Sequence, residues 1–167
     1  MAWSYRRKPE EKCAERAPAR DKALELLTGQ DFSCQGLYDR LCRRFTDEAA
    51  AYAVSEMVRL HYLDDERYAR VRARSLLMQH KSRRAIADAL RRKGIDRELI
   101  ADTLEDLYNE QEPGTDPELE AAQILVQRQY TRRLQEGRQD LVLAALARRG
   151  FSYRVARDAV ASVTRQA

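Results

Sequence analysis

The sequence predicts an all-α protein built of three tandem three-helix repeats, on three observations. First, apolar residues recur at helical spacings of three and four from Ala19 onward, and the alternating runs typical of strands are absent. Second, the 167 residues include only six glycines and four prolines, too few for the many tight turns of a β-rich fold. Third, one helix–turn–helix pattern occurs three times.

The elements follow from this periodicity in chain order. Residues 1–17 lack it and contain Pro9, so we expect a flexible basic tail. Nine helices are then predicted, at 19–29, 34–44, 48–61, 65–80, 83–93, 97–111, 117–134, 138–149 and 153–165. Grouped in threes, they predict repeats at 18–63, 64–115 and 116–167.

The repeat is defined by an apolar residue, a leucine four positions later, and a basic pair directly after the next residue. The three copies are Leu37, Leu41 and Arg43-Arg44; Ile86, Leu90 and Arg92-Lys93; and Val142, Leu146 and Arg148-Arg149. The leucines are predicted to be core residues. Each basic pair taken alone needs no function, because cations at a helix C-terminus complement the helix dipole.

The turn that follows each pattern also repeats. Gly94 and Gly150 stand where a helix end favours a left-handed residue, whereas Phe45 occupies that place in the first repeat. The next helices are predicted to be capped by Asp47, Asp96 and Ser152.

Charge is segregated along the chain although its net value is only +4. Residues 66–94 contain ten basic and two acidic side chains, 96–120 one basic and ten acidic, and 128–157 eight arginines and two acids. Such segregation indicates separate surfaces with separate roles. The alternative, an ordinary solvated face balanced by the acidic helix that follows it, stays open at this point.

Helical geometry gathers part of the positive charge on one side. At about 100° per residue, the helix predicted at 65–80 has a basic stripe and an apolar stripe opposite it. The basic stripe consists of Arg67, Arg70, Arg74 and Lys81. The apolar stripe consists of Ala69, Ala73, Leu76 and His80. Arg84 and Arg91 share the outward face of the next helix, and outward arginine is suited to phosphate or carboxylate groups.

Several classes of protein are not indicated. No stretch is apolar enough to span a membrane, and the N-terminal residues do not form a secretory signal. Three cysteines without a Cys-x-x-Cys motif predict neither disulfides nor a zinc site, and they fit a reducing cytoplasm. Motifs of phosphate loops, metalloproteases and serine hydrolases are missing, so we expect no enzymatic activity, cofactor or metal.

The acidic triplet that begins at Asp64 is the strongest metal-like feature. It lies directly before a predicted helix, where Asp64 and Asp65 are ordinary capping residues, and we prefer that interpretation. Tyr62 and Leu63 just before it are predicted to pack inside.

Three stretches carry a resemblance to a known family. Residues 61–69, His-Tyr-Leu-Asp-Asp-Glu-Arg-Tyr-Ala, resemble the Gly-Tyr-Leu-Asp-Asp-x-Arg-Phe/Tyr-Ala stretch of the RecX regulatory proteins. Residues 86–95 and 148–153 look like the second-repeat and third-repeat helices of that family. His61 replaces the usual glycine, His80-Lys81-Ser82 stands where glycine and proline are frequent, and residues 28–32 lack a common arginine.

The resemblance implies an elongated, curved array of three three-helix repeats that lodges in the groove of the RecA filament on single-stranded DNA. It implies restraint of strand exchange, ATP hydrolysis and the co-protease activity that drives the SOS response. We therefore expect a cytoplasmic, monomeric modulator of RecA that binds single-stranded DNA more weakly alone. The charge pattern, not the family, supplies the candidate contact residues, which are Arg67, Arg70, Arg74, Lys81, Arg84, Arg91, Arg92, Lys93, Arg148 and Arg149.

Two other functions remain open. One is a general nucleic-acid-binding protein without an obligatory protein partner, because short helices with a basic second helix are typical of helix-turn-helix modules. The other is a helical scaffold that binds proteins only. Whether DNA is required for binding, and how binding depends on salt, discriminates among the three.

Overall fold

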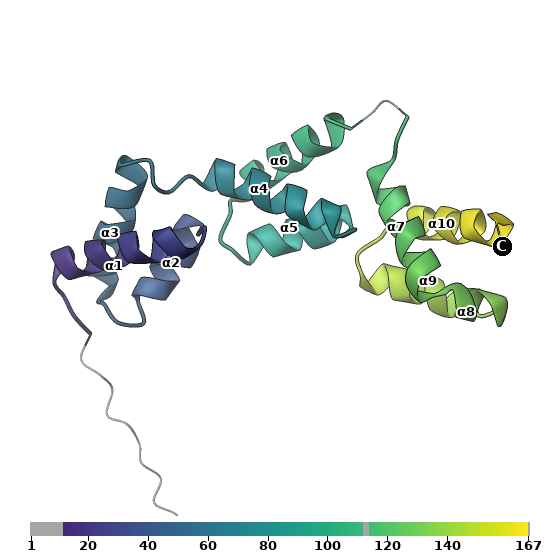
Figure 1. The fold of residues 1–167 in the computed structure, drawn as a ribbon, viewed down its shortest axis with the longest axis horizontal. Coiled ribbons are helices and arrows are strands. Elements are labelled where there is room, and N and C mark those ends of the chain that lie inside the picture. The colour runs from purple at the N-terminus through teal and green to yellow at the C-terminus, as the bar shows by residue number, and fades with distance from the viewer. Residues whose placement is uncertain (1–11, 112–113, 167) are drawn as a thin grey trace, which may run out of the picture. The chain divides into compact units, whose positions relative to one another are not determined.

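The computed structural model describes residues 12–111 and 114–166, and within these ranges the chain forms ten helices and no strand (Figure 1). The all-α prediction is therefore confirmed. The chain divides into two compact units, one ending at Tyr68 and one beginning at Ala69. None of the helices in the described ranges has the length and apolarity to cross a membrane.

The first unit contains α1 (Arg16–Gly29), α2 (Cys34–Leu41) and α3 (Asp47–Arg59). Their inner faces meet in one apolar cluster that includes Leu37, Leu41 and Met57. Ser33 caps α2 by accepting a hydrogen bond from the Gly36 N–H group at 3.1 Å. The leucine of the repeat is thus a core residue here, as predicted.

Three details of this unit differ from expectation. The cap of α3 is Thr46 rather than Asp47, which lies one position inside the helix. Helix α1 begins at Arg16, inside the range expected to be a flexible tail, and Cys13 exchanges backbone hydrogen bonds with Arg44 and Thr46. Residues 1–11 of that tail lie outside the described residues.

The stretch directly before the fourth helix also differs in part from the prediction. Leu63 is buried as predicted, but the Tyr62 side chain is 61% exposed, so the prediction that it packs inside is wrong. The two residues are adjacent in an extended turn, and only one of them reaches the core. Asp64 accepts a hydrogen bond from the Arg67 N–H group at 3.0 Å, which is the capping geometry expected.

The second group of helices comprises α4 (Asp65–Met78), α5 (Arg83–Arg91) and α6 (Arg97–Asn109). Ala69 and Ala73 of α4 are fully buried, as are Ile86 and Leu90 of α5. Asp96 caps α6, as predicted, through a 2.8 Å hydrogen bond from the Glu98 N–H group.

Two histidines adopt a backbone conformation that favours glycine. His61 follows α3 with φ of 58°, and His80 follows α4 with φ of 57°. Helix α4 therefore ends at Met78, and His80 terminates the helix instead of lining its core as expected. Gly94 and Gly150, at φ of 76° and 88°, have the predicted left-handed conformation.

The last group comprises α7 (Pro117–Gln129), α8 (Thr131–Gln135), α9 (Gln139–Arg148) and α10 (Tyr153–Gln166). The single helix predicted at 117–134 breaks at Tyr130, so α8 is a separate element that the sequence does not predict. An apolar cluster that includes Val126, Val142 and Leu146 holds the group together. Ser152 precedes α10 and accepts from the Val155 N–H group at 3.3 Å, as predicted for a cap.

Candidate functional site

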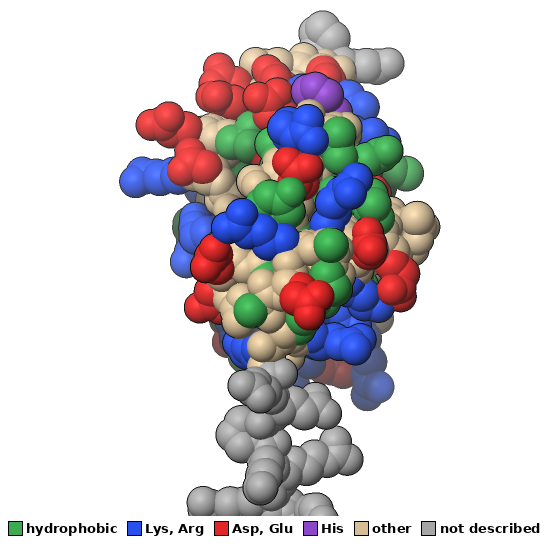
Figure 2. Space-filling model, turned by 90° about the vertical axis from the view of Figure 1, so that its left-hand side faces the viewer, with side chains coloured by type: hydrophobic (Ala, Val, Ile, Leu, Met, Phe, Trp, Pro, Cys, Tyr) green, Lys and Arg blue, Asp and Glu red, His purple; other side chains and the backbone are tan. Residues whose placement is uncertain are grey.

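The ten predicted contact residues are all exposed; they are Arg67, Arg70, Arg74, Lys81, Arg84, Arg91, Arg92, Lys93, Arg148 and Arg149. Figure 2 shows the face of the first unit that lies at the left of Figure 1. On this face basic (blue) and acidic (red) side chains are interspersed among hydrophobic (green) ones. Interspersed charge of both signs is common on solvent-exposed protein surfaces.

Helix α4 contributes three of these arginines. Arg74 forms an exposed ion pair in which its Nη2 atom lies 2.6 Å from Oε2 of Glu110. No carboxylate of the described residues lies within ion-pairing distance of Arg67 or Arg70. The side chains of these three α4 arginines are thus weakly fixed by ion pairs or not paired at all, because an exposed ion pair contributes little free energy.

Helix α5 and the turn before it contribute the next residues. Arg84 and Arg91 lie seven positions apart, which places them on the same face of α5. Arg91 forms an ion pair with Asp88 at 2.6 Å, and within the described ranges no such partner is found for Arg84. Lys81 lies in the turn rather than on the basic stripe predicted for α4, because that helix ends at Met78.

A joint connects the start of α5 with the turn between α9 and α10. The Ser82 hydroxyl donates to the Arg149 carbonyl oxygen at 2.7 Å and accepts from the Ala85 N–H group at 3.1 Å. Ser82 is fully buried. Gly150 approaches so closely that a Cβ atom there would lie 2.7 Å from the Ser82 Oγ atom and 3.3 Å from the Arg84 Cβ atom.

A second set of contacts supports the same joint. The Arg83 N–H group donates to Glu118 Oε1 at 3.3 Å, which fastens the start of α5 to the start of α7. The Arg83 guanidinium lies 5.1 Å from the centre of the Tyr108 ring, a cation–π geometry. Burial raises the pKa of the Glu118 carboxyl and, with the Glu118 charge as second cause, raises the pKa of Tyr108 to about 12.

The basic pair of the last repeat divides into two different roles. The Arg149 guanidinium donates to the Tyr130 hydroxyl and, at 2.9 Å, to Gln129 Oε1, and it lies over the Tyr130 ring. Arg148 is exposed, and the described part of the chain holds no ion-pair partner for it. Arg149 therefore serves the fold, whereas Arg148 remains available to a ligand.

The joint makes one site out of residues that are far apart in sequence. It brings the Cβ atom of Arg84 against Gly150, which directly follows Arg148 and Arg149 in the chain, although more than sixty residues separate them from Arg84. Each of the two segments thus carries an exposed arginine, and guanidinium groups are well suited to binding phosphate or carboxylate oxygens.

The remaining chemistry of the chain is sparse. The described residues contain no group of three potential metal ligands. Of the acidic residues at 64–66, Asp64 caps α4 as predicted, whereas the Asp65 side chain bonds outside its own helix. Asp65 accepts from the Cys34 N–H group at 2.8 Å. Burial, and secondly the Asp65 carboxylate, raises the pKa of the Cys34 thiol to about 11, which is the reverse of what a nucleophile requires.

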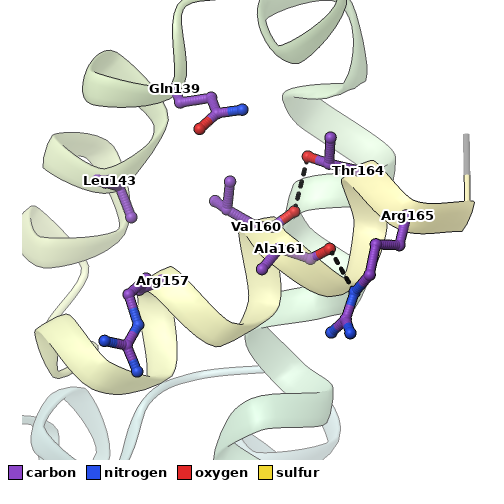
Figure 3. Close-up of a pocket in the computed structure, with 7 residues that line it drawn as sticks. All are labelled: Gln139, Leu143, Arg157, Val160, Ala161, Thr164 and Arg165. Atoms are coloured by element: carbon purple, nitrogen blue, oxygen red, sulfur yellow. Dashed lines mark hydrogen bonds between the residues drawn. The ribbon is translucent and has the colours of Figure 1, made fainter.

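A pocket of about 280 Å³ opens between α9 and α10 (Figure 3). Its floor is apolar, with Leu143, Val160 and Ala161, and its rim carries Arg157 and Arg165. The lining has no histidine, cysteine or carboxylate, so this pocket offers no acid–base or nucleophilic group.

Sequence reasoning missed the structural roles of Ser82, Arg83 and Glu118, because no local signal pairs α5 with residues so far along the chain. It also missed the exposed Val71 and Met78 on the outer face of α4. Their spacing of seven residues is the signal in the sequence that could have placed them there.

Comparison with known proteins decides the family. Residues 64–104 match the family profile described as RecX, second three-helix domain. The regulatory protein RecX of Trichlorobacter lovleyi is 39% identical over 111 residues, covering 65% of this chain and 68% of the relative. That of Mycolicibacterium smegmatis is 30% identical over 151 residues, covering 85% and 77%. The chain belongs to the RecX family.

A solved structure confirms the fold of this RecX family member. The crystal structure of RecX from Lactobacillus salivarius matches with a TM-score of 0.72 at 22% identity, covering 89% of this chain and 96% of that one. The family is one of regulatory proteins by name.

Proposed function

We propose that this chain binds the RecA filament on single-stranded DNA and restrains the recombinase, ATPase and co-protease activities of RecA. It would act as a monomer and without chemistry of its own, in the cytoplasm, and so regulate homologous recombination, DNA repair and the SOS response. The support is membership of the RecX family together with an exposed basic surface on a helical array.

The observation that carries the proposal is the joint at Ser82. It fastens the start of α5, which carries Arg84, to the turn that directly follows Arg148, so buried contacts rather than mobile loops join the two segments that carry these arginines. Neither has an ion-pair partner among the described residues, so neither has to give up an internal contact to bind phosphate.

Charge reversal of Arg70, Arg74 and Arg84 together tests the proposal. We expect the triple variant to lose inhibition of RecA-dependent ATP hydrolysis while its circular dichroism is unchanged, because all three side chains are exposed. The matched control reverses Arg20, Arg40 and Arg43, which are exposed on the first unit and change the net charge equally. Unchanged inhibition by the first variant removes this face from the mechanism.

Fluorescence anisotropy separates the main alternative. The labelled chain is titrated with the RecA filament, with bare single-stranded DNA and with RecA alone, each at two salt concentrations. Preference for the filament supports a modulator of RecA, whereas equal binding to bare DNA supports a general nucleic-acid-binding protein. Each phosphate contact should contribute about 0.7 to the slope of log affinity against log salt on a single strand.

A further inference from the structure

Helix α4 carries two large apolar side chains on its outer face. Val71 is 54% exposed and Met78 is 80% exposed. They lie seven residues apart, close to two helical turns, and therefore on one line along the helix. The line is opposite Ala69 and Ala73, which are fully buried in the core.

Arginine accompanies this apolar line. Arg74 lies between the two apolar residues on the same side, and Arg70 directly precedes Val71. We call Arg70, Val71, Arg74 and Met78 the α4 stripe. Arg70 has no carboxylate partner in the described part of the chain, and the Glu110 partner of Arg74 is itself exposed and readily exchanged for another.

Phosphate binding does not explain the apolar half of the stripe. A nucleic-acid backbone is recognised by charge and hydrogen bonds, and the side chains of valine and methionine supply neither. Solvent-exposed apolar side chains at positions i and i+7 are, by contrast, typical of a helix face that packs against another protein. Methionine is frequent on such surfaces.

We propose that the α4 stripe docks a protein segment that presents apolar side chains flanked by aspartate or glutamate, as an acidic amphipathic helix does. The apolar side chains would pack on Val71 and Met78, and the carboxylates would pair with Arg70 and Arg74. This inference rests on the proposed function, since the occupant is the protein component of the filament, while Arg84 and Arg148 face its DNA.

The test is the double variant Val71→Ser, Met78→Gln in the full chain. We expect affinity for the filament to fall at least about tenfold, because a valine and a methionine lose their burial against the partner, while affinity for bare single-stranded DNA stays unchanged. The loss should be nearly the same at both salt concentrations, since it is not electrostatic. Val58→Ser is the matched control, because Val58 is also an exposed helical valine, at 44%, but lies on α3.

The outcomes are distinguishable from failure of the proposed function. Wild-type affinity of the double variant for the filament overturns the docking inference alone, provided that the wild-type chain prefers the filament to bare DNA. A wild-type chain without that preference overturns both. Weaker binding of the variant to bare DNA would assign the stripe to nucleic acid. A wild-type chain that sediments as a dimer, with a variant that sediments as a monomer, would assign the stripe to a second copy of the chain. Either result also overturns the inference.

Discussion

Substitution of Gly150 by alanine should disrupt the joint between α5 and the α9–α10 turn. Gly150 has φ of 88°, and the added Cβ atom would lie 2.7 Å from the Ser82 Oγ atom. Real carbon and oxygen atoms do not approach so closely, so the Ser82 side chain must move. That hydroxyl is buried and makes the 2.7 Å hydrogen bond to the Arg149 carbonyl oxygen, which the movement breaks.

The cost has two parts. A left-handed backbone costs a residue with a Cβ atom about 1–2 kcal/mol. A buried polar group left without its hydrogen bond costs about 1–3 kcal/mol more. The free energy of unfolding should therefore fall by about 3 kcal/mol in Gly150→Ala. Gly137 provides the control, because its φ is 74° but nothing lies within 4 Å of its added Cβ atom, so Gly137→Ala incurs only the first cost.

Amide hydrogen exchange, read by NMR on the full chain, measures both variants. It reports on the unit beginning at Ala69 directly, which matters because two compact units need not unfold together. The Ala85 N–H group, which donates to the Ser82 hydroxyl at 3.1 Å, should lose protection in Gly150→Ala and keep it in Gly137→Ala. Equal destabilisation by the two substitutions would refute the reasoning.

Three further predictions concern single sites. His80→Gly should raise the free energy of unfolding by about 1 kcal/mol in urea denaturation, because φ of 57° strains histidine but not glycine. The pKa of the Cys34 thiol is raised to about 11 by burial and by Asp65, so the unfolded thiol ionises first as pH rises. The protonated thiol's contribution to stability is therefore complete below about pH 9 and lost between pH 9 and 11. Denaturation at pH 8 and at pH 10.5 measures this loss, with Cys34→Ala as the reference that lacks it. Arg149→Ala should lower the melting temperature through the loss of its contacts with residues 129 and 130, whereas Arg148→Ala should leave it unchanged and weaken DNA binding.

The parts of the fold that depend on local periodicity could be predicted from the sequence. Leu41, Leu90 and Leu146 are all buried, since a leucine in a fixed place of a helical repeat faces the same core each time. Gly94 and Gly150 end their helices as expected, because left-handed helix ends favour glycine.

Where two residues can serve the same local role, the sequence does not decide between them. Thr46 and Asp47 are both good caps, and the helix begins after the first. Tyr62 and Leu63 are both apolar neighbours, and one of them is left exposed. The helical pattern continues through His80 and predicts a core position for it, although the backbone turns left-handed there.

The candidate site was predictable only in composition. The exposure of its arginines follows from helical faces, and so does the inward position of Ala69 and Ala73. Which of the arginine-bearing segments meet does not follow, because the contact between Ser82 and Arg149 depends on the packing of one helix group on the next. Nor does the sequence distinguish Arg148 from Arg149, whose difference lies in the position of the Tyr130 ring.

Helix α8 accounts for a length difference between the repeats. The repeated apolar position advances by 49 residues from Leu37 to Ile86 and by 56 residues from Ile86 to Val142. The additional seven residues correspond in number to α8 with the two residues that follow it, and α8 contains no buried residue. Of its residues only Leu134 packs, partly buried, against the apolar cluster of the last group. Exposed segments with so little core contact tolerate insertions, and they also tolerate an attached label. A fluorescent dye at Gln135, which is exposed, would therefore report on binding from a position that neither the core nor the basic surface uses.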